Sequence, residues 1–94
     1  MMKIKILIIT DDVNGWFEKF VENLNLQSYK KNSSHGLNAE NEMFSIDIMF
    51  NFPINWRGRR YNSIILDKEI NGEEYNFIAK FPKGILYTEK FKLL

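Results

Sequence analysis

The chain contains no cysteine and a single histidine among its 94 residues. Without cysteine it can form no disulfide bond, no zinc–thiolate site and no thiol nucleophile. The one histidine, His35, lies between Ser34 and Gly36 in a segment of turn-forming residues. No Ser–His–Asp triad or metal cluster can be built around it from sequence spacing. We therefore expect His35 to be an exposed loop residue.

Long hydrophobic runs are also missing. The first apolar run, residues 4–9, is interrupted by Lys5 and is not followed by a small-residue cleavage site, so no signal peptide is predicted. No stretch approaches the roughly 20 apolar residues that are needed to span a bilayer. These absences predict a cytoplasmic protein that does not contact a membrane.

The charges nearly balance, and no cofactor motif is present. The chain has 13 Lys and Arg against 12 Asp and Glu, a net charge of +1, which by itself does not indicate a nucleic-acid-binding protein. Ser63–Asp67 resembles the acidic end of a Walker B strand, but no glycine-rich phosphate loop and no Gly-x-Gly-x-x-Gly motif occurs. P-loop chemistry and dinucleotide binding are therefore excluded, and we expect no cofactor and no enzymatic activity.

Apolar and aromatic residues are abundant, and their spacing predicts strands and helices. The near-continuous Ile and Leu run of Lys3–Thr10 is typical of a strand buried on both faces. Met43–Phe50 alternates between apolar and polar residues, as a half-buried strand does. Between them, apolar residues recur at helical spacing over residues 13–24. The apolar share of 45% is enough to build a core without metal or disulfide support.

The remaining elements complete one α/β domain over residues 1–94. A second buried strand is predicted at 62–67, a short helix at 73–81 and a last strand at 85–88. We expect Leu26–Lys31 and Met43–Phe50 to form a hairpin, with a loop over 32–42. The sum is a small single-domain fold of two or three layers, with two helices and a mainly parallel or mixed sheet of four or five strands.

Carboxylates follow the two buried strands at the point where each strand ends. Asp11 and Asp12 come directly after the first strand, and Asp67 ends the second. We expect these two strands to be neighbours in the mainly parallel sheet, so that the three side chains share one edge of the sheet, where carboxylate oxygens are suitable ligands for Mg²⁺. The alternative, which we favour, is that Asp12 caps the following helix, Asp11 is solvated and Asp67 begins a polar turn.

This acidic pattern resembles part of a response-regulator receiver domain. The acidic pair after the first strand and Asp67 after a middle strand are followed by Thr88 and Lys90, where a hydroxyl and a lysine are expected. The resemblance implies that one of the carboxylates Asp11, Asp12 and Asp67 accepts a phosphoryl group. The chain is shorter than a full receiver by one strand and at least one helix. We therefore keep a receiver-like or Mg²⁺-binding domain as an alternative and do not adopt the family.

Arginine and aromatic residues gather before the second buried strand, in the docking segment Trp56–Tyr61. It contains three arginines, one tryptophan and one tyrosine: Trp56, Arg57, Arg59, Arg60 and Tyr61. Such residues combine bidentate hydrogen-bond donors with stacking faces, and they dominate binding energy at protein interfaces. The alternative is that the two aromatic side chains pack on the sheet while the arginines pair with nearby acids.

From these features we expect a non-enzymatic binding or regulatory protein that docks Trp56–Tyr61 on a protein partner. The small size and the abundance of Asn, Lys and Ile favour an accessory factor or inhibitor of the kind that phages and mobile elements encode. A nucleic-acid-binding module that uses the same segment is the alternative. A homodimer is a further expected assembly, because so apolar a small domain can bury an exposed patch against its own copy.

Overall fold

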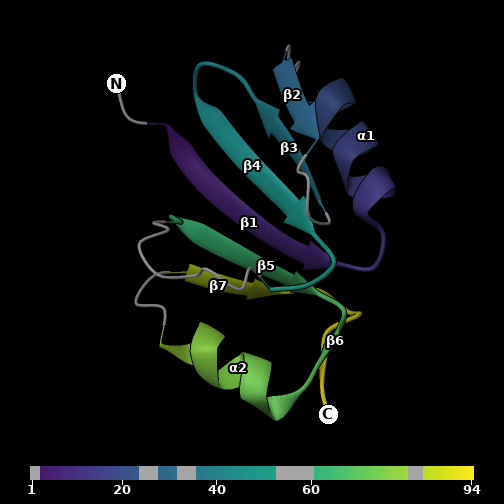
Figure 1. The fold of residues 1–94 in the computed structure, drawn as a ribbon, viewed down its shortest axis with the longest axis vertical. Coiled ribbons are helices and arrows are strands. Elements are labelled where there is room, and N and C mark those ends of the chain that lie inside the picture. Colours follow the sequence, from purple (N-terminus) through teal and green to yellow (C-terminus); the bar gives the residue numbers. More distant parts are fainter. Residues whose placement is uncertain (1–2, 24–27, 32–35, 53–60, 81–83) are drawn as a thin grey trace.

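The computed structural model describes residues 3–23, 28–31, 36–52, 61–80 and 84–94. The described residues form a six-stranded sheet, two helices and a small two-stranded sheet (Figure 1). In chain order the elements are β1 (Ile4–Thr10), α1 (Val13–Asn23), β2 (Ser28–Lys31), β3 (Gly36–Glu40), β4 (Phe44–Met49), β5 (Ser63–Asp67), β6 (Glu69–Ile70), α2 (Gly72–Ala79), β7 (Gly84–Tyr87) and β8 (Lys92–Leu93).

The six-stranded sheet is mixed and has the order β2-β3-β4-β1-β5-β7. Strands β4, β1, β5 and β7 run parallel to one another, whereas β3 is antiparallel to both β2 and β4. The short strands β6 and β8 pair with each other in parallel. Parallel strands end at a common edge, so the carboxyl ends of β1, β5 and β7 lie together at one edge of the sheet.

The structure confirms the predicted α/β class, the two helices and the mixed sheet. It also confirms that β1 and β5 are parallel neighbours, with Thr10 in register with Asp67. The predicted hairpin is wrong, because Gly36–Glu40, which we assigned to a loop, forms β3 and lies between β2 and β4. This inserted strand brings the sheet to six strands, where four or five were expected.

Each face of the sheet carries one helix, and the two helices lie over opposite ends of the sheet (Figure 1). On the face that we name the α1 face, α1 packs over β3 and β4. Its apolar side lies against a buried cluster of Ile8, Ala39, Ile46 and Ile48. On the other face, the α2 face, Ile78 of α2 joins a second buried cluster with Leu7, Ile9, Ile64 and Leu66.

The neighbouring strands β1 and β5 supply side chains to both clusters, which is why they read as nearly continuous apolar runs. Neither described helix has the length and apolar character that a membrane-crossing helix requires.

Candidate functional site

The carboxyl edge of the sheet is organised around Asp67, the last residue of β5. Its side chain is only 4% exposed. The Oδ2 atom accepts hydrogen bonds from the Thr10 hydroxyl, at 2.8 Å, and from the Trp16 indole N–H, at 2.7 Å. The Oδ1 atom accepts a hydrogen bond from the Thr88 hydroxyl. Both carboxylate oxygens therefore have donors from within the protein, and the donors come from the end of β1, from α1 and from the residue after β7.

These donors set the charge state of Asp67. Burial of the carboxylate raises its pKa, but the hydrogen bonds from Thr88, Trp16 and Thr10, together with the positive charge of Lys90, lower the pKa by more. The net result is a pKa below the ordinary value of 3.8. Asp67 is therefore ionised at neutral pH, and its negative charge is compensated inside the protein.

The other two predicted carboxylates lie at the same edge but are exposed. The Oδ1 atom of Asp12 accepts a hydrogen bond from the Gly15 backbone N–H, at 3.2 Å, which is the interaction of a helix N-cap. The Oδ1 atom of Asp11 lies 3.7 Å from the Lys90 ammonium, in an exposed ion pair of the kind that contributes little to stability. These contacts agree with the alternative that we favoured from the sequence, in which Asp12 caps a helix and Asp11 is solvated.

Asp11, Asp12 and Asp67 are not grouped in the structure as a set of three metal ligands. Among the described residues, no three His, Asp or Glu side chains are arranged so that they could hold a metal ion. What the edge contains instead is a hydrogen-bonded network that joins β1, β5, α1 and the segment after β7. Its chemical effect is to hold one ionised carboxylate in place.

Sequence reasoning placed Thr88 and Lys90 near Asp67 but missed two of its partners. Trp16 was expected only as part of the apolar stripe of the first helix, and Thr10 only as the end of a strand. In the structure Trp16 makes two kinds of contact. Its ring packs against the α1-face cluster, and its indole N–H donates a hydrogen bond to Asp67. A tryptophan that packs on a core, as the partly buried Trp16 does, usually finds a hydrogen-bond partner for its N–H. This preference is the signal that could have linked Trp16 to a carboxylate.

The docking segment falls largely outside the described residues, which include Tyr61 but not Trp56, Arg57, Arg59 or Arg60. Tyr61 is 5% exposed and belongs to the α2-face cluster. Its hydroxyl donates a 2.6 Å hydrogen bond to Oδ2 of Asp47. Tyr61 is therefore a core residue, and its ring is not exposed to a partner. This agrees with the alternative in which the aromatic side chains of the segment pack on the sheet.

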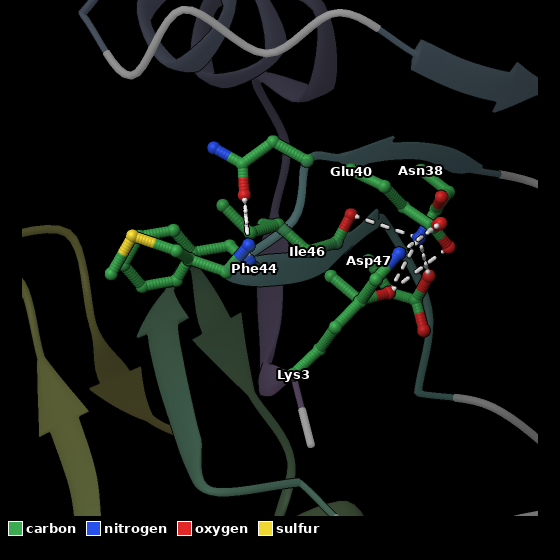
Figure 2. Close-up of polar contacts among 9 residues, drawn as sticks. Lys3, Asn38, Glu40, Phe44, Ile46 and Asp47 are labelled. Carbon is green, nitrogen blue, oxygen red and sulfur yellow. Dashed lines mark hydrogen bonds and ion pairs between the residues drawn. The ribbon is translucent and has the colours of Figure 1, made fainter. Parts of the chain in front are cut away.

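The Tyr61 hydroxyl is hydrogen-bonded to a polar network on β3 and β4. Figure 2 shows Asn38 and Glu40 from β3 close to Asp47 from β4, with Lys3 reaching toward them. The Asn38 amide donates to Oδ1 of Asp47 at 2.8 Å, and the Lys3 ammonium lies 3.0 Å from the Glu40 carboxylate. Asp47 thus links Tyr61 to this network. Phe52, which precedes residues 53–60 in the sequence, packs against the same α2-face cluster that contains Tyr61.

One half of the α1 face is left open by the described residues. Ile8 of β1, Ile65 of β5 and Leu86 of β7 are neighbours in one row across this face. Ile8 lies under α1 and is fully buried, Ile65 is partly buried, and Leu86 is 57% exposed. Exposure thus rises with distance from α1, which packs over β3 and β4 and against the cluster that contains Ile8. Neither described helix covers β5 and β7 on this face.

Comparison with protein-family models, curated proteins and solved structures found no match to this chain.

Proposed function

We propose that this chain is a non-enzymatic binding protein that docks on a larger macromolecule, a protein in the first instance, through residues 56–60. The observation that carries the proposal is that, in the sequence, this arginine-rich stretch lies between two residues that pack on the core. Tyr61 is buried in the α2-face cluster and is held by its hydrogen bond to Asp47, and Phe52 is partly buried and packs against the same cluster. A rigid scaffold that presents a connecting segment is a common arrangement for binding sites.

The residue types of the segment support contact with a partner. Arginine and tryptophan are enriched among the residues that dominate interface energy, and each guanidinium can bind a carboxylate through two parallel hydrogen bonds. Fixing the ends of a segment before it binds also reduces the conformational entropy that is lost on association. Asp67, in contrast, already accepts hydrogen bonds from side chains of the protein on both carboxylate oxygens.

Replacing Arg57, Arg59 and Arg60 together with alanine tests the proposal. We expect at least a tenfold loss of affinity for the partner that co-purifies from the native host, which corresponds to about 1.4 kcal/mol and is modest for interface arginines. The measurement is quantitative capture from host lysate, followed by titration of the captured component.

The matched control removes the same charge elsewhere, at the exposed residues Lys19, Lys80 and Lys92. We expect the lysine variant to bind within about twofold of wild type, since it leaves the docking segment intact. Equal binding by the wild type and both variants would remove the proposal. A large drop in unfolding free energy of the arginine variant would instead support the alternative in which the arginines pair with acids of the fold.

A nucleic-acid partner for the same segment is distinguished by salt. Each phosphate contact releases condensed counterions, so affinity for nucleic acid falls steeply as salt is raised. A protein partner is expected to show a shallower dependence. Steep salt dependence with a DNA or RNA oligonucleotide, abolished in the arginine variant, would establish the nucleic-acid-binding alternative.

A magnesium or receiver-like site at the carboxyl edge is the second alternative, and one observation favours it: Asp11, Asp12, Asp67, Thr88 and Lys90 come from strand ends that meet at this edge. We nevertheless expect millimolar Mg²⁺ to leave the backbone amide shifts of Asp11, Asp12 and Asp67 unchanged, because Asp67 already has donors on both oxygens. Saturable shifts at all three residues in an NMR titration would overturn this expectation and establish the metal site.

A further inference from the structure

Strand β7 (Gly84–Tyr87) is an edge strand of the six-stranded sheet, and no described residue pairs with its outer side. Within the described parts of the chain it pairs only with β5. An unpaired edge presents a row of backbone donors and acceptors to any other strand, and proteins commonly protect such edges with lysine, proline or a bulge. The opposite edge strand, β2, ends in Lys30 and Lys31, whereas the four residues of β7 carry no charge and no proline.

Apolar side chains flank the β7 edge on both faces of the sheet. On the α1 face Leu86 is 57% exposed, beside the partly buried Ile65. On the α2 face Tyr87 is 48% exposed and packs against Phe91, with ring centroids 4.7 Å apart. A strand added beside β7 would therefore gain backbone hydrogen bonds and cover apolar surface on both faces at once.

We propose that a second copy of this chain occupies the β7 edge, by antiparallel pairing of β7 with β7 of the second copy about a two-fold axis at Leu86. In this register Leu86 lies opposite its own copy on the α1 face, and Ile85 lies opposite Tyr87 of the second copy on the α2 face. Aromatic and β-branched residues are favourable cross-strand partners. The two sheets join into one of twelve strands, and the lysine-bearing β2 edges remain outermost.

The composition of the strand is compatible with pairing to its own copy. The four residues of β7 are Gly-Ile-Leu-Tyr and carry no charge, so two copies of the strand pair without bringing like charges opposite each other. The net charge of +1 adds little repulsion between copies. Because an isologous contact needs only one edge per copy, it closes as a dimer.

Sedimentation velocity of the full chain over a concentration series tests the dimer. We expect the mass to rise from that of the monomer to twice that value, and we expect Leu86→Lys to weaken dimerisation at least tenfold because it places like charges at the axis. The matched control is Phe77→Lys, which changes an exposed apolar residue of α2 and should dimerise as the wild type does. A wild type that stays monomeric at about 1 mM, or a Leu86→Lys variant that dimerises normally, would overturn the proposal.

Single cysteines give a second readout that does not depend on a disruptive substitution, since the chain has no cysteine of its own. Residues directly opposite in an antiparallel pair have Cα atoms about 4.5–5.5 Å apart, within the range that a disulfide bridges. With oxidised glutathione as oxidant, we expect Leu86→Cys to form a covalent dimer at least tenfold faster than Phe77→Cys. Equal rates would contradict the two-fold register.

Discussion

Replacing Asp67 with alanine is expected to lower the free energy of unfolding by about 3–5 kcal/mol. The substitution removes the acceptor for two hydroxyls and one indole N–H, which come from Thr10, Thr88 and Trp16. A hydrogen bond to a charged group contributes about 1.5–3 kcal/mol, and a buried donor left without a partner adds a desolvation cost. For a domain whose total stability is about 5–15 kcal/mol, the loss is a large part of the whole.

Urea unfolding at neutral pH measures this effect. Asp67→Asn keeps the shape of the side chain and retains one acceptor oxygen, so we expect an intermediate loss. The control is Asp11→Asn, which changes an exposed carboxylate at the same edge and should alter stability by no more than about 0.5 kcal/mol. If Asp67→Ala were as stable as wild type, the hydrogen-bonded network would not be what holds this edge together.

The contribution of Asp67 also depends on pH in a defined direction. Its pKa in the folded protein lies below the ordinary value of 3.8, so the folded state binds the proton more weakly than the unfolded state does. The stabilisation is therefore fully present above the unfolded pKa and is lost as pH falls through the lower, folded pKa. We expect the stability difference between wild type and Asp67→Asn to be constant at neutral pH and to shrink below about pH 4.

Replacing Ile64 with alanine is the second large effect that we expect. Ile64 is fully buried in the α2-face cluster, where α2 and the side chains of β1 surround it. Truncating a fully buried isoleucine to alanine removes apolar contacts and leaves a cavity, which typically costs about 2–5 kcal/mol. Chemical denaturation with an unchanged denaturant slope would assign the loss to the folded state.

The adjacent residue provides the control for Ile64. Ile65 points to the α1 face, on the half that α1 does not cover, and is only partly buried. We expect Ile65→Ala to cost less than half as much as Ile64→Ala at protein concentrations low enough to keep the chain monomeric. Equal losses at the two positions would mean that the open half of the α1 face is in fact covered.

The central part of the fold followed from the sequence, because continuous apolar runs are a strong signal for strands buried on both faces. The parallel neighbours β1 and β5 were predicted for that reason. Strand β3 was missed because its sequence, Gly-Leu-Asn-Ala-Glu, contains turn-forming and polar residues and has low strand propensity. Its apolar residues Leu37 and Ala39 are in register with Ile48 and Ile46 of β4. The segment therefore forms a strand because it pairs with β4, and its own sequence gives little indication of this.

The candidate site was predictable only in part. The shared edge of Asp11, Asp12 and Asp67 follows from the parallel arrangement of β1 and β5, and the helix-capping role of Asp12 follows from its position before an apolar stripe. The burial of Asp67 does not follow, because it requires Trp16 and Thr88, which lie 51 and 21 residues away along the chain. Contacts at such separation are set by the packing of α1 and β7 against β5.

The most direct test of the account is a capture experiment that compares three forms of the full chain: wild type, Asp67→Asn and the triple alanine variant of Arg57, Arg59 and Arg60. It is performed under conditions where all three forms are folded, as verified by circular dichroism. We expect Asp67→Asn to retain the same partner as wild type, and the arginine variant to lose it. Loss of the partner by folded Asp67→Asn, with retention by the arginine variant, would place the working site at the carboxyl edge and contradict the account.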